Sequence, residues 1–288
     1  MAHPQIAAFA RLADGDAKAT RSIAGQESLI TRDIHDMAYN ALTDEIVIPQ
    51  ARAQAIMTYR GGASGYEKPL RVIYGPDTQM TTPMRLGLDA VHKEIFVPSY
   101  RGDAILVFPS DGEGNVAPIR IIKGPDTQLG AAAVTIDPVH NLLIVAGPRP
   151  ARRQGESARI GQGGGEEGGG GHILIFNRTD NGNVKPRAAI FGPKTKIGSS
   201  AQSLITVNPS RQYILRGVPS DERSSPNNFV GVWSENDNGD VPPRWMIGGP
   251  NQLLRQVRGI TLVPKDKTVV ISDKYVNVVM TYYFPEIF

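Results

Sequence analysis

The sequence has no cysteine at all, which excludes disulfides, thiolate metal sites and cysteine nucleophiles. Aromatic residues are only 7% of the chain, and no run approaches the roughly 18 apolar residues that a membrane-spanning helix needs. Residues 1–11 lack a cationic end followed by an apolar run, so we expect no secretory signal peptide in this chain. The net charge of +3 is too small to indicate a nucleic-acid partner by itself.

Glycine and proline are abundant, with 31 and 22 of the 288 residues, and 40% of the residues are hydrophobic. This composition is typical of a globular chain that can bury a core. It favours many short strands joined by turns over long helices.

A repeated segment is the strongest signal in the sequence. Gly75-Pro-Asp-Thr-Gln-Met recurs as Gly124-Pro-Asp-Thr-Gln-Leu, looser copies begin at Gly192 and Gly249, and the most decayed begins at Gly25. The successive spacings are 50, 49, 68 and 57 residues. The two long intervals hold a Gly/Arg-rich insertion at about 148–171 and a shorter insertion at about 219–228. The repeat unit is therefore close to 50 residues, which is typical of a propeller blade.

Each unit contains four short segments rich in β-branched and aromatic residues, separated by turn residues. We name them strands A to D. Strand A is predicted at 37–39, 86–88, 134–136, 204–207 and 260–263, and strand B at 45–48, 94–97, 142–145, 212–215 and 268–271. Strand C is predicted at 55–59, 104–108, 172–176, 230–233 and 278–282, and strand D at 70–74, 119–123, 188–191, 245–247 and 21–24.

The prediction is an all-β, single-domain β-propeller over residues 1–288, with five four-stranded blades. The fifth blade is split, because its strands A to C lie at the C-terminus and strand D lies near the N-terminus. We expect the terminal segments to pair and close the fold, which would remove exposed sheet edges. Residues 6–10 also look like a strand C, so six blades are the alternative.

The repeat resembles NHL-type and YVTN-type β-propeller proteins of bacteria. The resemblance is carried by Leu88–Val97, Ala104–Phe108 and Asp111–Arg120, and the pattern extends over nearly the whole chain. It implies a blade architecture and a secreted or periplasmic location. Relatives of this type include protein-binding, RNA-binding, lyase and lactone-hydrolase members, so the resemblance leaves the function open.

Charged residues sort by loop in this topology. The D–A and B–C loops share one face, where the predicted ligand-binding residues are Arg85, Arg258, Ser203, Arg32, Arg101 and Arg255. The opposite face collects acidic residues in its C–D turns: Asp14, Asp16, Asp111, Glu113, Asp180, Asp237 and Asp240. A cationic mouth attracts anions, and arginine offers paired N–H groups to carboxylate or phosphate.

The five histidines show no metal-ligand spacing, so the sequence predicts neither a metal site nor a cofactor. His35 and Asp36 are placed near the axis, where they are candidates for a catalytic acid–base pair; the alternative is a polar lining of a wet channel. His92 and His140 occupy equivalent A–B turns, which repeat inheritance explains. Strand alternation predicts that Tyr39, Trp233 and Trp245 pack in the core or between blades.

Two segments resemble calcium-binding loops, Asp180-Asn-Gly-Asn and Asp237-Asn-Gly-Asp. They lack the spacing and closing glutamate of that site, and Asn-Gly is a strong hairpin-turn signal. We therefore interpret them as turns.

The preferred function is a non-catalytic binding or scaffold propeller, whose basic face and axial mouth bind an anionic small molecule, a polymer or a protein partner. The alternative is a propeller lyase or hydrolase that uses His35 and Asp36, with Arg85 or Arg258 stabilising substrate charge. Nucleic acid is a third partner class, which the mild net charge does not favour, and no membrane span is expected.

Overall fold

The computed structural model describes residues 4–99, 103–130, 133–148, 170–198, 204–218, 228–249 and 251–288. Most of the two predicted insertions, with Arg101 and Ser203, lies outside these residues. The described part of the chain forms 21 strands and six short 3-10 helices. None of its helices is long and apolar enough to cross a membrane.

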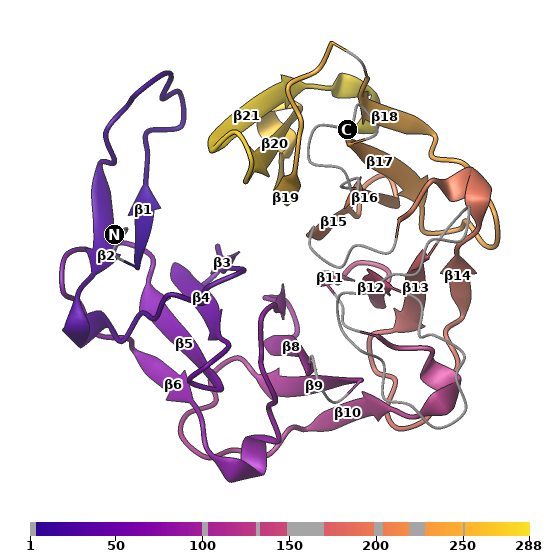
Figure 1. Cartoon of the computed structure of the whole chain (residues 1–288). Helices are drawn as coiled ribbons and strands as arrows, with labels where there is room; N and C mark the ends of the chain where they lie inside the picture. Colours follow the sequence, from indigo (N-terminus) through magenta and orange to yellow (C-terminus); the bar gives the residue numbers. More distant parts are fainter. Residues whose placement is uncertain are drawn as a thin grey trace. The chain divides into compact units, whose positions relative to one another are not determined.

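Four sheets have four strands each, which follow one another in chain order (Figure 1). The first two are β3 (Ala38–Asn40), β4 (Glu45–Gln50), β5 (Ala55–Arg60), β6 (Arg71–Ile73), and β7 (Gly87–Asp89), β8 (Glu94–Ser99), β9 (Ala104–Pro109), β10 (Arg120–Lys123). The next two are β11 (Ala133–Asp137), β12 (Leu142–Pro148), β13 (Gly171–Asn177), β14 (Ala188–Ile190), and β15 (Ile205–Asn208), β16 (Tyr213–Val218), β17 (Phe229–Ser234), β18 (Trp245–Gly248).

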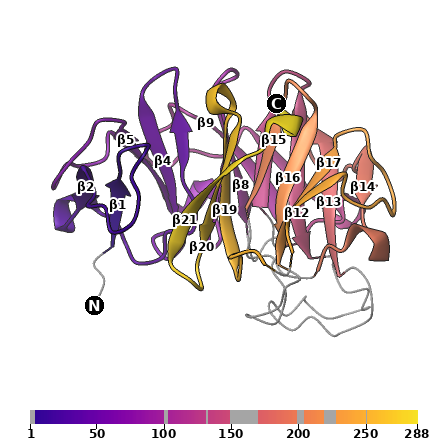
Figure 2. The same ribbon diagram turned by 90° about the horizontal axis from the view of Figure 1, so that it is seen from above.

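The two ends of the chain form smaller sheets. The C-terminal strands β19 (Val257–Val263), β20 (Thr268–Asp273) and β21 (Val278–Tyr283) make a three-stranded antiparallel sheet with β20 in the middle (Figure 2). The N-terminal strands β1 (Gln5–Ala8) and β2 (Arg21–Ala24) pair with each other. Their register, with Ile6 opposite Ile23, repeats the strand C to strand D pairing of Ile56 with Ile73. The additional strand C predicted at 6–10 is therefore confirmed as a strand.

This succession of antiparallel four-stranded sheets confirms an all-β, five-bladed β-propeller, because each repeat forms one blade whose strands A to D are neighbours. The described residues divide into two compact units, residues 1–102 with 106–119 and residues 103–105 with 120–288. The pairing of the two chain ends and the single-domain organisation stay predictions. Each site below lies within one unit.

The Gly-Pro-Asp-Thr segment of the repeat builds a turn that locks onto the following C–D turn. Gly75 adopts φ 120°, and a Cβ there would lie 2.4 Å from Asn115 Oδ1, so only glycine fits. The Thr78 hydroxyl donates to the Gly75 carbonyl at 2.7 Å, and the Asp77 N–H donates to Asn115 Oδ1 at 2.9 Å. The strongest sequence signal thus encodes architecture.

A second repeated contact links strand D to a glycine of the next C–D turn. Parallel bridges join Ile23 to Gly65, Ile73 to Gly114, Ile122 to Gly182 and Ile190 to Gly239. Asn181 Oδ1 also accepts the Ile121 N–H at 2.9 Å. The Asn-Gly segments are therefore hairpin turns that also join blades, in agreement with the sequence interpretation.

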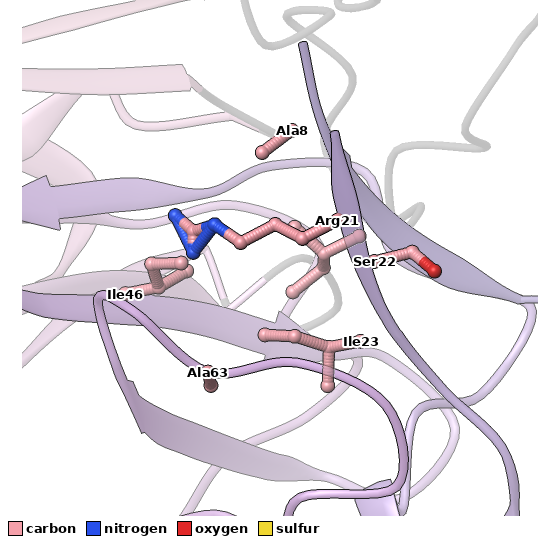
Figure 3. Close-up of a pocket in the computed structure, with 7 residues that line it drawn as sticks. Ala8, Arg21, Ser22, Ile23, Ile46 and Ala63 are labelled. Atoms are coloured by element: carbon pink, nitrogen blue, oxygen red, sulfur yellow. The ribbon is translucent and has the colours of Figure 1, made fainter. Parts of the chain in front are cut away.

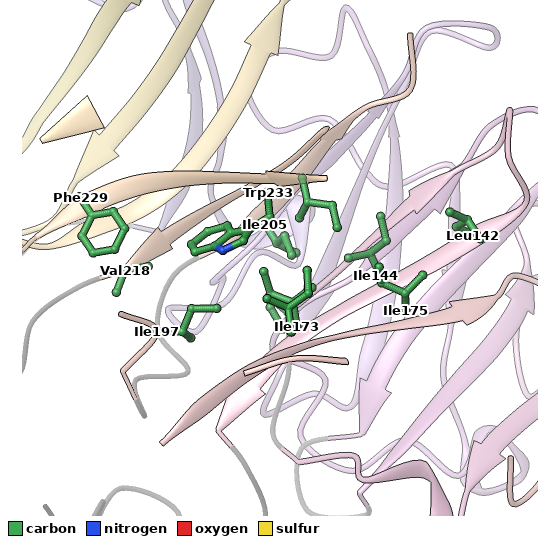
Figure 4. Packing of buried hydrophobic residues seen from close by; sticks show 13 residues of the cluster. Leu142, Ile144, Ile173, Ile175, Ile197, Ile205, Val218, Phe229 and Trp233 are labelled. Carbon is green, nitrogen blue, oxygen red and sulfur yellow. The ribbon is translucent and has the colours of Figure 1, made fainter. Parts of the chain in front are cut away.

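The hydrophobic core lies between consecutive sheets within each unit. In the second unit, residues from β12, β13, β15 and β17 meet around the fully buried Trp233 (Figure 4), and burial of this kind is the main driving force of folding. Trp245 is partly buried, with its ring 5.2 Å from that of Tyr213. The core prediction is wrong for Tyr39, which is 59% exposed, because its hydroxyl donates instead to Asp44 Oδ1.

Candidate functional site

The loops of each blade sort to two ends, as side-chain and backbone hydrogen bonds show. At one end, Thr31 of a D–A loop donates its N–H to Gln50 Oε1 at the close of strand B, and Arg255 donates its N–H to Asp273 Oδ2. We call this the D–A/B–C end. At the other, the A–B/C–D end, the Glu235 N–H reaches the Gln212 carbonyl at 2.9 Å.

At the D–A/B–C end of the first unit, Asp36 and Arg85 come together. Arg85 is 5% exposed. Asp36 Oδ1 accepts the Met37 N–H at 2.8 Å and its Oδ2 accepts the Leu86 N–H at 3.2 Å. Burial raises the pKa of Asp36 to about 6, against the opposing effects of the Arg85 charge and of these two N–H groups. Asp36 thereby fastens the start of one strand A to the start of the next.

The two other predicted residues of this unit that the structure describes are on the surface. His35 and Arg32 are exposed, whereas the carboxylate of Asp36 accepts backbone N–H groups. Arg52 of a B–C turn forms an ion pair with Asp33 of a D–A loop, which places part of the cationic charge against an acid. The catalytic role of His35 and Asp36 stays a prediction.

At the same end of the second unit, three arginines lie on or beside strands. Arg255 and Arg258 are half-buried, and Arg255 Nη1 donates to the carbonyls of Gln252 and Leu254. Arg258 lies on β19 at a register shift between Val257 and Gly259. Arg216, which the sequence analysis did not single out, is 3% exposed and donates to the His172 carbonyl at 2.8 Å.

At the A–B/C–D end, two blades carry the same Asp-x-x-His turn. His92 Nδ1 lies 2.8 Å from Asp89 Oδ2, and His140 Nδ1 lies 2.8 Å from Asp137 Oδ2. Asp137 Oδ1 accepts the N–H groups of Val139 and His140, which is a common way for aspartate to stabilise a turn. Both aspartate side chains are fully buried. Repeat inheritance accounts for this pair in both blades.

Among the described residues, only the second of these turns belongs to a group of three potential metal ligands. One ligand atom each of Asp137, His140 and Glu235 lies within 4.8 Å of the other two, and Glu235 Oε2 is 3.8 Å from His140 Nδ1. The Glu235 side chain is 1% exposed. Within the part of the chain that the structure describes, no donor group reaches either oxygen of the ionised carboxylate, so a hydrogen bond between Glu235 and Asp137 needs a proton on one of the two carboxyl groups.

The electrostatic surroundings of Glu235 are unusual. Burial, followed by the nearby Asp137 carboxyl, raises the pKa of Glu235 to about 8, while Arg187 acts in the opposite direction. The pKa of Asp137 is lowered: burial alone would raise it, but hydrogen bonds from the ring and N–H of His140, from the Glu235 carboxyl group and from the Val139 N–H together outweigh burial. Two carboxyl groups this close are difficult to ionise together.

Sequence reasoning missed this cluster because its third member lies in the next blade. Asp137 and His140 are three residues apart, but Glu235 follows β17. The only sequence signal was a charged residue at the position after strand C, where the preceding repeat has Arg178. The two positions are equivalent, because the backbone N–H groups of Arg178 and Glu235 each bond to the A–B turn of their own blade.

A small hollow lies in the first unit under the N-terminal hairpin (Figure 3). It is lined by Ile6, Ala8, Arg21, Ser22, Ile23, Ile46 and Ala63. Arg21 Nη1 donates to the Gly61 carbonyl at 2.8 Å. With apolar walls and its only cationic side chain engaged, the hollow offers little to a polar ligand.

The blades, their interlocking turns and these loop clusters define the class of the protein as a β-propeller. No protein-family model and no curated protein sequence matches the chain. Among solved structures, it is similar to hydrazine synthase of Kuenenia stuttgartiensis, with TM-score 0.54, 10% identity, and coverage of 83% of this chain and 55% of that chain. The chain thus spans about half the length of that protein.

It is also similar to a chain in the crystal structure of a nidogen/laminin complex, with TM-score 0.57, 15% identity, and coverage of 98% of this chain and 91% of that one. At such identities the likeness shows the fold alone. The NHL or YVTN subtype stays a prediction.

Proposed function

We propose that the protein is a non-catalytic binding or scaffold propeller whose D–A/B–C end binds an anionic ligand or an acidic protein partner. A propeller fold is compatible with a binding or scaffold role. The observation that supports the proposal is the arginine charge held at this end in both units: Arg85 in the first, and Arg216, Arg255 and Arg258 in the second. Arginine charge held close to a low-dielectric interior attracts anions more strongly than charge in open water does.

A binding role is favoured over an acid–base role by the surroundings of Asp36. Both of its oxygens accept backbone N–H groups, which is the arrangement of a structural carboxylate. A general base needs an oxygen that can reach the substrate proton. The finer parts of the proposal, an NHL-type subfamily and a secreted or periplasmic location, are supported by the sequence resemblance.

Binding to three anionic probes tests the proposal: heparin, inorganic tripolyphosphate and duplex DNA, each measured by calorimetry at low salt. The double variant Arg32→Ala/Arg258→Ala removes one cation at the D–A/B–C end of each unit. We expect it to weaken heparin or tripolyphosphate binding by about tenfold or more, since charge-assisted hydrogen bonds are lost.

The matched control is Lys185→Ala/Lys265→Ala, which removes two exposed cations from the A–B/C–D end. This control has the same net charge as the arginine double variant, but it should bind the anions as tightly as the wild type does. Equal weakening by both double variants would show that binding follows net charge and not this end. Preferential binding of DNA with a steep salt dependence would favour a nucleic-acid partner.

A further inference from the structure

Three metal-ligand side chains from two consecutive blades meet at the A–B/C–D end of the second unit. Asp137 closes β11, His140 lies in the turn that follows, and Glu235 follows β17. Their ligand atoms lie within 4.8 Å of one another. One histidine nitrogen and two carboxylate oxygens form a donor set that suits a borderline divalent ion.

Glu235 is the observation that separates this cluster from an ordinary turn. Its side chain is 1% exposed and directed at the cluster, and no N–H or O–H group among the described residues donates to either oxygen of the ionised carboxylate. Only a shared proton would let Glu235 hydrogen-bond to Asp137. A buried polar group without a partner is costly. The cationic neighbour Arg187 offsets only one of the two carboxylate charges, so a proton or a cation is required there.

The distances fit one ion. The Asp137 Oδ2 to His140 Nδ1 separation is 2.8 Å and the His140 Nδ1 to Glu235 Oε2 separation is 3.8 Å. Ligands of a tetrahedral ion at 2.0–2.2 Å are about 3.3–3.6 Å apart, which lies between these two separations. Asp137 Oδ1 holds the N–H groups of Val139 and His140, so the carboxylate is oriented with Oδ2 toward the histidine.

Access and charge are also compatible with an ion. The His140 side chain is 34% exposed while Asp137 is buried, so the site opens to solvent on the histidine side. Binding through Nδ1 releases its proton to solvent, and three protein ligands leave one position for water.

We propose that Asp137, His140 and Glu235 bind one divalent transition-metal ion, with Zn²⁺ as the ion that best fits the donor set. The ion would bridge the third and fourth blades of the chain, which both belong to the second unit. It would lie at the end of this unit opposite Arg216, Arg255 and Arg258. The proposal is independent of the anion-binding function.

The experiment uses full-length, tag-free protein stripped with a chelator and titrated with Zn²⁺ by calorimetry, with Co²⁺ absorption as a second readout of coordination. We expect one ion per chain. Glu235→Gln keeps the shape of the side chain but removes its charge, and His140→Ala removes a ligand from a partly exposed position. Each should weaken binding by more than about 100-fold, since ligands matter at least as much as the groups that orient them.

The matched control is His92→Ala, because His92 makes the same 2.8 Å contact with Asp89, and this pair belongs to no group of three potential ligands among the described residues. It should bind Zn²⁺ as the wild type does. Far-UV circular dichroism of the metal-free variants verifies folding. The proposal is overturned if the wild type binds no stoichiometric ion, if Glu235→Gln retains full affinity, or if His92→Ala loses affinity to the same degree.

Discussion

Two A–B turns of this propeller have the same Asp-x-x-His sequence and the same geometry, yet their surroundings differ. In both, the histidine Nδ1 lies 2.8 Å from a fully buried aspartate. Beside the Asp137–His140 turn lies the buried carboxyl group of Glu235; the preceding repeat has Arg178 at the position equivalent to Glu235. The Asp137–His140 turn thus carries a second buried carboxyl group from the next blade, and this cluster needs a proton or a cation.

The largest expected effect comes from removing the aspartates. Asp89→Ala should lower the free energy of unfolding by about 3 kcal/mol, because buried hydrogen-bond donors lose their acceptor. Asp137→Ala should cost about 2 kcal/mol, since it also relieves the repulsion with Glu235. Urea denaturation in the presence of a chelator measures both, and an equal or larger loss for Asp137→Ala would contradict the comparison.

A carboxylate of the first unit extends the comparison, because both oxygens of Asp36 accept backbone N–H groups, whereas the oxygens of the Glu235 carboxylate accept none among the described residues. Its pKa in the folded protein, about 6, lies above the ordinary value of 3.8. The folded state therefore holds the proton more tightly than the unfolded state, so stability from this group is present below about pH 4 and is lost as pH rises through about 6. The loss should be about 2 kcal/mol.

Asp36→Asn should remove this pH-dependent loss, measured as the difference between variant and wild type in urea midpoints from pH 4 to pH 7. Arg85→Gln should move the loss to higher pH, because the Arg85 charge lowers the pKa of Asp36. An Asn variant with the same pH profile as the wild type would be inconsistent with this assignment.

Replacing Glu235 tests the repulsion directly. In chelator at pH 7, Glu235→Gln should raise the free energy of unfolding by about 1 kcal/mol, because the wild-type carboxyl group, with its pKa raised to about 8, takes up a proton on folding and the amide does not. The amide can also donate to the Asp137 carboxylate. A destabilised variant under these conditions would mean that the wild-type carboxyl group already has a favourable partner.

The smallest effect is expected for the two histidines. Without metal, His92→Ala and His140→Ala should each lower the free energy of unfolding by less than about 1 kcal/mol, because both rings are about one-third exposed and such contacts are screened. Adding Zn²⁺ should raise the melting temperature of His92→Ala and leave that of His140→Ala unchanged. Identical responses would remove the distinction between the two turns.

Most of the blade pattern could be predicted from local sequence. Strand positions such as 55–59 and 278–282 agree with β5 and β21 to within one residue, because alternation and turn residues act over a few positions. The prediction for Tyr39 failed, since alternation gives the face of a strand but cannot tell whether that face is covered. Of the predicted site residues, Asp36 and Arg85 do lie together, whereas Arg101 and Ser203 lie outside the described residues.

The sequence alone determined the repeat, its four-strand unit and its turns, because glycine at positive φ and Asn-Gly hairpins are set by the chain's own sterics. Which charges meet depends on how the blades pack against one another. Glu235 reaches Asp137 because consecutive blades pack through their hydrophobic faces around Trp233, and that contact joins residues far apart in the chain. Buried electrostatics depend on distance in space, which no local pattern encodes.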